Sequence, residues 1–289
     1  MTCPQLQAKL NILKSARTLL AQYDATNTNK AATAEMRVMT EEWEVVLDEL
    51  AEHFWQEKII KSEKEALEKY FDQPIEVPKL PAEVTKAKLE FWKQNQFALH
   101  YSPGLEIPQD NTFPGQKKKI DADVYKWIKE KEINSDTIKL PKGWILIDTR
   151  PKPQYNNGDQ MYENDILGPV LEKLRKENHI ENFKHEDSRF NISNDELQKP
   201  EVKAAIAEVL KVRADQLSLP LTALWNYLGN AFYPEWGDTN TWEWFEDEYK
   251  GGYRLYGGLS NHDGLSYVGC DSSGDRDASI GFRPLVVFS

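Results

Sequence analysis

Residues 251–289 read GGYRLYGGLSNHDGLSYVGCDSSGDRDASIGFRPLVVFS, and this segment decides how the rest of the chain is interpreted. It ends in an almost wholly apolar run, Ile280 to Phe288, which predicts a strand. The glycine-rich part before that run follows neither a helical nor a strand period. The segment also lacks Lys, Glu, Gln, Met and Trp, although these types make up about a third of the preceding residues. Average amino-acid usage does not predict so restricted a composition.

The composition of the whole chain narrows its class. A chain of 289 residues can bury a substantial core, and a hydrophobic fraction of 40% argues against a disordered protein. The net charge of −11 argues against nucleic acid or an anionic membrane as a partner. Only Cys3 and Cys270 occur, which excludes a disulfide framework and a cysteine-based zinc site.

Nothing in the sequence is long and apolar enough to predict a membrane span, and no signal peptide is visible. We expect synthesis in the cytoplasm. The final location stays open, with display at a cell or virion surface as one alternative.

The first part of the chain predicts helices. Apolar residues recur at helical spacing over 5–22 and over about 33–71, where the length favours a helical hairpin or a kinked pair. Another helix is expected to begin near Ala82 and to carry apolar residues as far as Phe97.

The segment Tyr101 to Lys119 predicts a linker, because it gathers three prolines, two glycines and the charge run Lys117-Lys118-Lys119. We therefore expect an α-helical region over 1–115 and a second domain over 116–289. A short helix over 121–131 would begin that domain.

The second part predicts a mixture of strands and helices. Gly143 to Thr149 is a β-rich run, and helices are expected over 163–176, 201–212 and 221–228. Asn194 is expected to cap a short turn before the helix that starts at Pro200. The fold class is therefore α+β.

A run dense in aromatic residues extends from Phe232 to Tyr249. It could line a carbohydrate-binding groove, but we favour a place in the core for Trp236, Trp242 and Trp244, because their apolar area suits a glycine-rich domain.

No catalytic, metal or cofactor motif is present. The chain has no phosphate-binding glycine loop, no dinucleotide fingerprint and no HExxH, and its histidines are scattered. The carboxylates of Glu246, Asp247 and Glu248 are interpreted as a solvated acidic surface rather than a calcium site. Cys270 has no activating partner nearby in sequence. We therefore expect a protein that is not an enzyme and holds no cofactor or metal.

Two motifs carry a family resemblance. Arg254-Leu255-Tyr256-Gly257-Gly258, followed by a polar stretch and then Gly281-Phe282-Arg283-Pro284, resembles the C-terminal part of a C-type lectin fold. This version of the fold is shared by formylglycine-generating-enzyme-like domains and by the variable proteins of diversity-generating retroelements, among which the archaeal ones are most similar to this chain. The resemblance covers roughly 121–289. It implies that the first and last strands pair, which would join Trp144–Ile147 to Phe282–Phe288.

The missing residue types distinguish the two relatives. Diversity-generating retroelements rewrite template adenines, chiefly in AAC codons. Substitution of both adenines yields fifteen residue types, but never Lys, Glu, Gln, Met or Trp, and all five of these are missing after Lys250. The formylglycine enzymes need a pair of cysteines here, and the calcium-dependent sugar lectins need EPN- or WND-type triplets; neither is present.

The resemblance implies a hypervariable binding surface within a variable region at about 253–283. The apolar frame and two glycines are expected to be invariant: Leu255, Leu265, Val268, Ile280, Phe282, Gly257 and Gly281. The expected ligand-binding positions are Tyr256, Ser260, Asn261, His262, Asp263, Tyr267, Gly269, Cys270, Asp271, Ser272, Ser273, Asp275, Asp277 and Ser279. Ser266, Gly274 and Arg276 could equally belong to that set. Tyr among Ser, Gly, Asn and Asp is also typical of antibody paratopes.

The expected function is thus recognition of a protein or cell-surface ligand, with the oligomeric state left open. Two alternatives remain at this point. One is a formylglycine-generating-like enzyme with altered chemistry that uses Cys270, and the other is a viral or cell-surface fibre subunit whose helices oligomerise.

Overall fold

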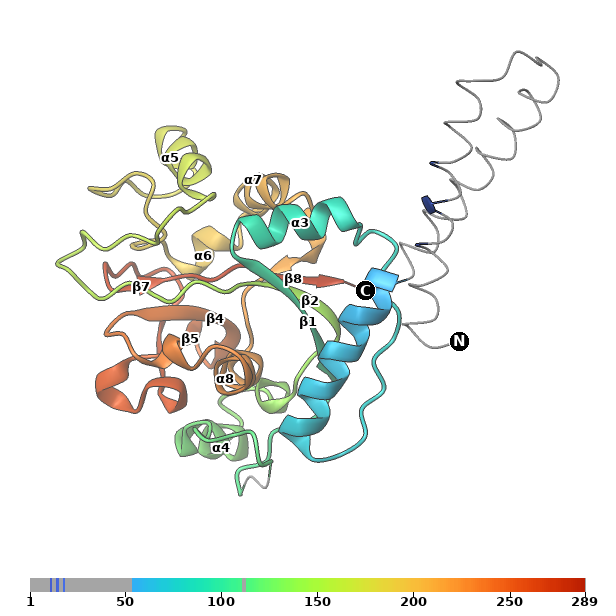
Figure 1. The fold of residues 1–289 in the computed structure, drawn as a ribbon. Coiled ribbons are helices and arrows are strands. Elements are labelled where there is room, and N and C mark those ends of the chain that lie inside the picture. The colour runs from blue at the N-terminus through green and yellow to red at the C-terminus, as the bar shows by residue number, and fades with distance from the viewer. Residues whose placement is uncertain (1–10, 12–13, 16–17, 19–53, 111–112, 289) are drawn as a thin grey trace, which may run out of the picture. The chain divides into compact units, whose positions relative to one another are not determined.

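The computed structural model describes residues 11, 14, 15, 18, 54–110 and 113–288. The chain divides into two units, 1–62 and 63–289. Residues 54–71 are helical (Figure 1), and so are the four described residues of the predicted helix over 5–22; the rest of that helix and residues 33–53 of the one over 33–71 lie outside the described residues. The account that follows concerns the unit 63–289.

This unit has a mixed α+β fold with two four-stranded sheets. The first sheet has the order β1-β2-β8-β3, and all its neighbours are antiparallel. Its strands are β1 (Phe97–Pro103), β2 (Lys142–Asp148), β3 (Leu217–Ser218) and β8 (Leu285–Phe288). The predicted pairing of the strand at Trp144 with the last strand is confirmed, since Trp144 lies opposite Phe288 and Ile147 opposite Leu285.

Strand β1 corrects two predictions. Phe97 belongs to this strand and not to the preceding helix, which is α3 (Lys86–Gln94) with Thr85 as its N-cap. The residues at 101–103, assigned to a linker, pair with β2. The compact unit therefore begins upstream of the domain boundary expected between 115 and 116. The strand was missed because nearly all of it is buried, so it shows no alternation of apolar and polar residues.

The second sheet has the order β6-β5-β4-β7. It comprises β4 (Trp242–Tyr249), β5 (Tyr253–Gly257), β6 (Val268–Ser272) and β7 (Ile280–Gly281), with β7 parallel to β4. The glycine-rich part of the quoted segment thus contains strands that its sequence period does not indicate. These strands are held by cross-strand pairing, because β5 lies between β4 and β6.

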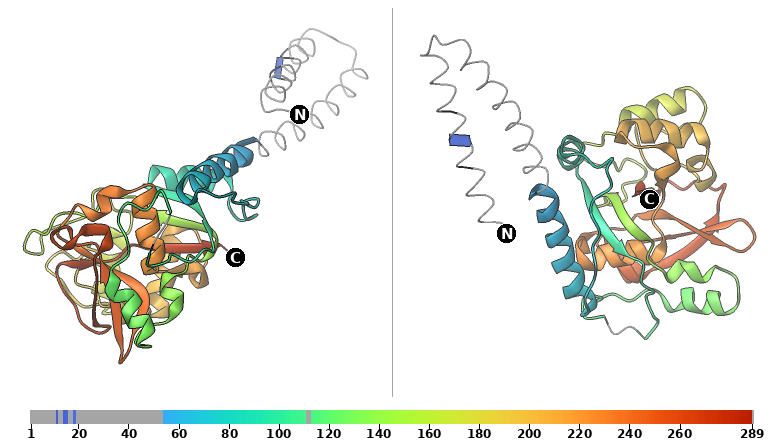
Figure 2. Two further views of the ribbon diagram at one scale, coloured as in Figure 1. Left: turned by 90° about the horizontal axis from the view of Figure 1, so that it is seen from below. Right: turned by 90° about the vertical axis from the view of Figure 1, so that its right-hand side faces the viewer.

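The helices surround the sheets (Figures 1 and 2). They are α4 (Ala122–Lys129), α5 (Gly168–Lys176), α6 (Asn194–Leu197), α7 (Pro200–Leu210) and α8 (Thr222–Ala231), with 3-10 turns at η1 (Ser135–Ile138), η2 (Ala214–Gln216), η3 (Pro234–Gly237), η4 (Ser260–His262) and η5 (Gly264–Ser266). Pro200 begins α7, as predicted. The short helix α6, which precedes α7, has Ser193 and not Asn194 as its N-cap, because the Ser193 side chain accepts a hydrogen bond from the Glu196 N–H in a capping box. Helix α5 starts five residues later than expected, at Gly168.

Helix α8 is central to the core. Its Trp225 ring packs against Phe245 of β4 at 5.5 Å between ring centroids, and its Tyr227 ring packs against Tyr70 at 4.9 Å. Most of its residues are buried, since it contacts β4 and β5 of the second sheet and, through Tyr227, the rings of Tyr70 and Phe71. This explains why its sequence is mostly apolar, with Asn226 and Asn230 as the polar residues that bond the Lys118 backbone.

Candidate functional site

Residues 251–288 form the closing part of both sheets. Gly251 and Gly252 connect β4 to β5, and their φ angles of +85° and +86° are accessible to glycine at little cost. After β5 the chain makes the turns η4 and η5, returns as the edge strand β6, and closes through β7 and β8.

The residues expected to form the invariant frame are all buried: Leu255, Gly257, Leu265, Val268, Ile280, Gly281 and Phe282. A Cβ atom on Gly257 would lie 2.5 Å from the Tyr267 carbonyl oxygen, so no larger residue fits there without movement of the backbone. These positions support the surface and are not exposed to a ligand.

The expected ligand-binding positions all retain some exposure. Asn261, His262, Asp263, Asp275 and Asp277 are exposed. Tyr256, Ser260, Tyr267, Gly269, Cys270, Asp271, Ser272, Ser273 and Ser279 are half-buried. They lie in three groups, on the turns η4 and η5, on the β5–β6 pair, and in the loop between β6 and β7.

The first group surrounds Asp263, which has a left-handed φ of +75°. The His262 and Tyr267 rings lie beside it, 5.1 Å apart between centroids. Lys118 Nζ is 2.7 Å from Asp263 Oδ1 in an exposed ion pair. Both side chains are exposed, so a ligand can reach the two charges, and separating such a pair costs little stability.

Two surface hollows flank Asp263, with volumes of about 400 and 580 Å³. These volumes are in the range of small-ligand sites. Asp263 lines both hollows, and the 117–119 segment supplies a rim residue to each. The turns η4 and η5 therefore form one wall of a concave surface, and residues outside the quoted segment form the other.

The second group lies on the two faces of the β5–β6 pair. Tyr256 is directly opposite Gly269, and Leu255 is opposite Cys270, so Tyr256 and Cys270 lie on different faces of the sheet. The Tyr256 ring is 5.1 Å from the Trp242 ring and shares a hydrogen bond with Tyr267. The structure thus brings Tyr256, Gly269 and Tyr267 together with the first group, and separates Cys270 from them.

Cys270 is a free, half-buried thiol. Burial raises its pKa, and the carboxylates of Asp271 and Glu132 raise it further. A thiol of raised pKa is a weak nucleophile at neutral pH.

The third group lies in the loop after β6 and is fastened to residues 191–196. Ser273 O accepts a hydrogen bond from the Asp195 N–H, and Asp277 O accepts one from Asn191 N–H. Arg276 forms an ion pair of 2.9 Å with Glu196. The loop returns to the second group at Ser279, whose carbonyl accepts the Trp242 N–H at 2.9 Å.

A buried charge network supports the start of the η4 turn. Lys152, 2% exposed, donates from Nζ to the carbonyl oxygens of Gly258 at 2.5 Å and Thr241 at 2.8 Å. Burial lowers its pKa to about 7; Glu243 acts in the opposite direction and Arg283 adds to the lowering. Burial also acts to raise the pKa of Glu243, but Arg283 and Lys152 outweigh it and hold that pKa below its usual value.

The acidic cluster of β4 is not a solvated surface as predicted. Asp247 is 5% exposed, and its Oδ2 accepts hydrogen bonds from the Thr222 N–H at 2.6 Å and the Thr222 hydroxyl at 2.7 Å. It therefore caps the N-terminus of α8. Glu246 Oε2 accepts the Leu219 N–H at 3.1 Å, and only Glu248 is exposed.

Each described histidine is hydrogen-bonded in the core or at least partly exposed. His100 is buried and satisfied, with Nδ1 3.1 Å from Glu63 Oε1 and Nε2 2.6 Å from the Tyr233 hydroxyl. His179 and His185 are half-buried and His262 is exposed; His53 lies outside the described residues. In the part of the chain that the structure describes, no group of three or more His, Cys, Asp or Glu side chains could hold a metal ion.

Sequence reasoning missed two contributors to the surface. Trp236 and Trp244 are in the core, as predicted, but Trp242 is half-buried beside Tyr256. Lys118, placed in a linker, is fixed by its backbone, because its N–H donates to Asn230 Oδ1 at 2.8 Å and its carbonyl accepts from Asn226 and Asn230. No local pattern reports these contacts, and those of Lys118 join residues more than a hundred positions apart.

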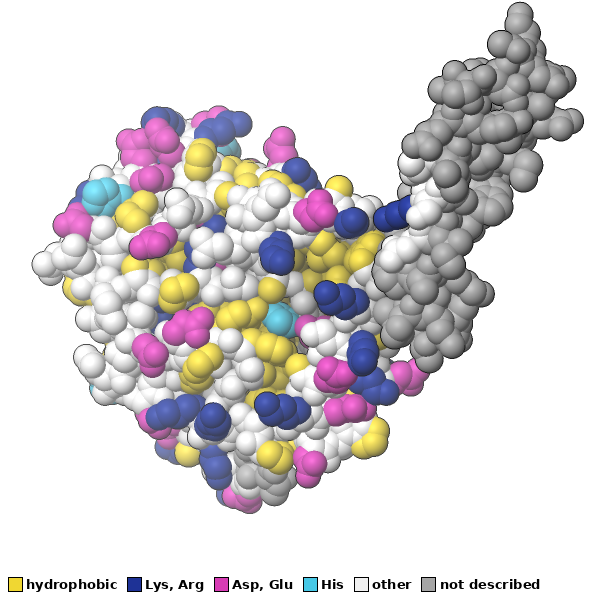
Figure 3. Space-filling model, viewed as in Figure 1, with side chains coloured by type: hydrophobic (Ala, Val, Ile, Leu, Met, Phe, Trp, Pro, Cys, Tyr) yellow, Lys and Arg dark blue, Asp and Glu magenta, His cyan; other side chains and the backbone are white. Residues whose placement is uncertain are grey.

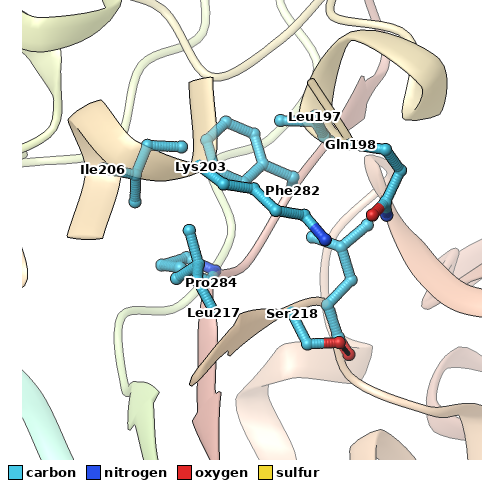
Figure 4. A pocket seen from close by; sticks show the side chains of 9 residues that line it. Leu197, Gln198, Lys203, Ile206, Leu217, Ser218, Phe282 and Pro284 are labelled. Carbon is cyan, nitrogen blue, oxygen red and sulfur yellow. Dashed lines mark hydrogen bonds between the residues drawn. The ribbon is translucent and has the colours of Figure 1, made fainter. Parts of the chain in front are cut away.

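Another cavity, between α6, α7 and β3, is too small for a ligand. Figure 4 shows Phe282 and Ile206 on its walls and the Lys203 side chain across it. Its volume of about 10 Å³ is at the limit for one water molecule. The view in Figure 3 shows acidic and basic side chains intermingled, with hydrophobic side chains gathered near the middle of that face.

A search of the described residues for a helix able to cross a membrane finds none. Comparison with protein-family models, with curated proteins and with solved structures finds no match to this chain.

Proposed function

We propose that this chain is a ligand-binding protein of the diversity-generating-retroelement class, with a C-type lectin fold and a surface diversified through adenine substitution. The observation that carries the proposal is the absence of Lys, Glu, Gln, Met and Trp from residues 251–289. These are the types that substitution of both adenines in AAC does not produce. The ligand would be a protein or a cell-surface molecule.

The sheet topology supports the lectin-fold part of the proposal. The strand at Trp144 pairs with the last strand, which is the pairing that the family resemblance implies. The motif residue Arg283 ties that region to the second sheet, because it donates to Asp148 O at 2.5 Å and to Glu243 Oε2 at 3.1 Å.

The distribution of burial supports the diversified-surface part. Every residue expected to be variable is half-buried or exposed, and every expected frame residue is buried. Substitutions at exposed positions generally cost little stability, whereas core substitutions cost more. A mechanism that changed only the expected positions would therefore leave the frame intact.

The chemistry of Cys270 favours binding over the enzymatic alternative. An oxidase of the formylglycine-generating type needs two cysteines, and Cys270 is a half-buried thiol of raised pKa that faces away from Tyr256. We therefore propose recognition without catalysis.

The DNA beside the gene tests the proposal. We expect a near-identical copy of the segment that encodes residues 251–289, differing from it mainly at adenines, together with a reverse-transcriptase gene. Codons for the fourteen expected binding positions should correspond to AAC-type codons in the copy. A neighbourhood that holds neither element would refute diversification.

A further inference from the structure

Trp242 lies where the second and third groups of the surface meet. Its ring is half-buried at the start of β4 and lies 5.1 Å from the Tyr256 ring. Its backbone N–H is bonded to Ser279 O, and Tyr256 lies opposite Gly269. Two expected binding positions, Tyr256 and Ser279, thus contact a tryptophan that lies upstream of the quoted segment, and a third, Gly269, lies opposite Tyr256.

The Tyr256 ring occupies the space above Gly269. A Cβ atom on Gly269 would lie 2.8 Å from Tyr256 Cζ and 2.9 Å from its Cε2 and Oη atoms. Real Cβ atoms do not approach other atoms so closely. Because the obstructing atoms are at the far end of a half-exposed side chain, the ring can turn away while the backbone stays in place. Any larger residue at 269 therefore displaces the ring.

Displacement of the ring would uncover Trp242. The Tyr256 ring packs against Trp242 and, edge to face at 5.8 Å, against the fully buried Trp244. The Trp242 indole N–H is buried and has no hydrogen-bond partner. A buried donor without a partner is uncommon and costs free energy, so exposure to an acceptor would be favourable.

We propose that Trp242, Tyr256 and Gly269 form one recognition unit with two forms, selected by the size of the residue at 269. With glycine, the unit presents the Tyr256 phenol and conceals the indole. With a larger residue, it presents the Trp242 indole to an apolar side chain and a carbonyl acceptor of a polypeptide partner. The inference rests on the proposed function, because positions 256 and 269 belong to the proposed binding surface.

Trp242 would be the fixed anchor of this unit. Tryptophan cannot arise from the adenine substitutions considered above, and large aromatic side chains carry much of the affinity at protein interfaces. The variable residues would then determine whether the anchor is available, in addition to making contacts of their own.

Fluorine NMR of the full chain labelled with 5-fluorotryptophan tests the proposal without a ligand. The resonance of Trp242 is assigned as the one missing from the Trp242→Phe variant. The change in its chemical shift between H₂O and D₂O reports the solvent exposure of the Trp242 ring. Gly269→Ser and Tyr256→Ser should each increase that solvent-induced shift of Trp242. The Gly269→Ser/Tyr256→Ser double variant should show a shift only slightly larger than that of Tyr256→Ser, because the ring is already absent. Gly274→Ser is the matched control, because a Cβ there meets its nearest neighbour, Asp195 Oδ2, at an ordinary 3.5 Å.

The outcomes are distinguishable. An unchanged Trp242 resonance in Gly269→Ser, when thermal unfolding shows the variant to be folded, would overturn the coupling. An unchanged resonance in Tyr256→Ser would show that the ring does not cover the indole and would overturn the unit itself. Either result leaves the proposed function standing, whereas absence of the template copy would remove that function and leave the NMR result untouched.

Discussion

At the scale of single residues, the environment of a side chain departs from what its neighbours in sequence suggest. Asp247 lies between two other carboxylates, yet it is buried at the N-terminus of α8. Burial raises its pKa to about 6, although the hydrogen bonds from Thr222 act in the opposite direction. The acidic run therefore contains one carboxylate with a structural role.

This raised pKa predicts a pH dependence. Between about pH 4 and 6 the folded state binds more protons at Asp247 than the unfolded state, so this residue's contribution to stability is lost as the pH rises through that window. The free energy of unfolding of the wild type, minus that of Asp247→Asn, should fall by roughly 2–3 kcal/mol from pH 4 to pH 7. Urea denaturation at several pH values measures this difference. The exposed Glu248→Gln is the control for loss of one charge, and a flat difference for Asp247→Asn would contradict the shift.

At the scale of elements, buried charges connect the two sheets. Arg283 follows β7 and is fully buried; its Nη2 lies 2.8 Å from Glu243 Oε1 of β4, and its Nη1 donates to the carbonyl of Asp148 at the end of β2. Glu243 also accepts hydrogen bonds from Tyr162 and Trp225. The closing strands are thereby fastened to both sheets.

Breaking this connection should be costly. Arg283→Met leaves the buried negative charge of Glu243 without its arginine partner, and we expect a loss of about 3–5 kcal/mol in the free energy of unfolding. In the Arg283→Met background, Glu243→Gln should recover part of the loss, because it removes the buried negative charge and keeps an acceptor for Tyr162 or Trp225. Urea denaturation of the single and double variants tests this. Strictly additive losses would mean that the two side chains do not interact.

At the scale of the whole molecule, the unit 63–289 includes the end of the helix over 54–71. Leu67, Tyr70 and Phe71 are buried in its core, and Glu63 accepts the Tyr101 N–H at 3.1 Å. These contacts belong to the compact unit, although sequence reasoning placed them in a separate helical region.

Two truncations should therefore behave differently. A chain of residues 54–289 should unfold within about 3 °C of the full chain, because it keeps these contacts. A chain of residues 72–289 loses three large buried side chains and should melt at least about 10 °C lower, or fail to fold. The Leu67→Ala/Phe71→Ala variant of the full chain is the control that separates lost packing from lost length. Equal melting temperatures for the two truncations would contradict this core assignment.

The predictable part of the fold is the part whose signals are local. Pro200 at the start of α7 and the β-rich run at Trp144 each depend on neighbouring residues, and both elements are present. The pairing of the Trp144 strand, β2, with the last strand, β8, was expected through the family resemblance, because no local signal encodes it.

Strands β1, β4 and β5 are among those that the sequence did not predict, and each was missed for a physical reason. Most of β1 and half of β4 are buried, including charged residues of β4, so their sequences lack the alternation that marks a half-buried strand. In β5, the glycine and aromatic residues are suited to packing against the neighbouring strands β4 and β6 and follow no strand period of their own. Asn194 was expected as the cap in place of Ser193 because both residue types cap helices and only the backbone geometry distinguishes them.

The sequence by itself determined the composition of residues 251–289, with its absence of Lys, Glu, Gln, Met and Trp, and the α+β class. It also predicted which of these residues pack inward, since an apolar side chain is stabilised by leaving water wherever it lies. Only the tertiary structure decided that Trp242 lies half-buried against Tyr256, that the Tyr256 ring fills the space above Gly269, and that Lys118 faces Asp263. These are contacts between separate strands and loops, and the path of the backbone, not the local pattern, determines which side chains meet.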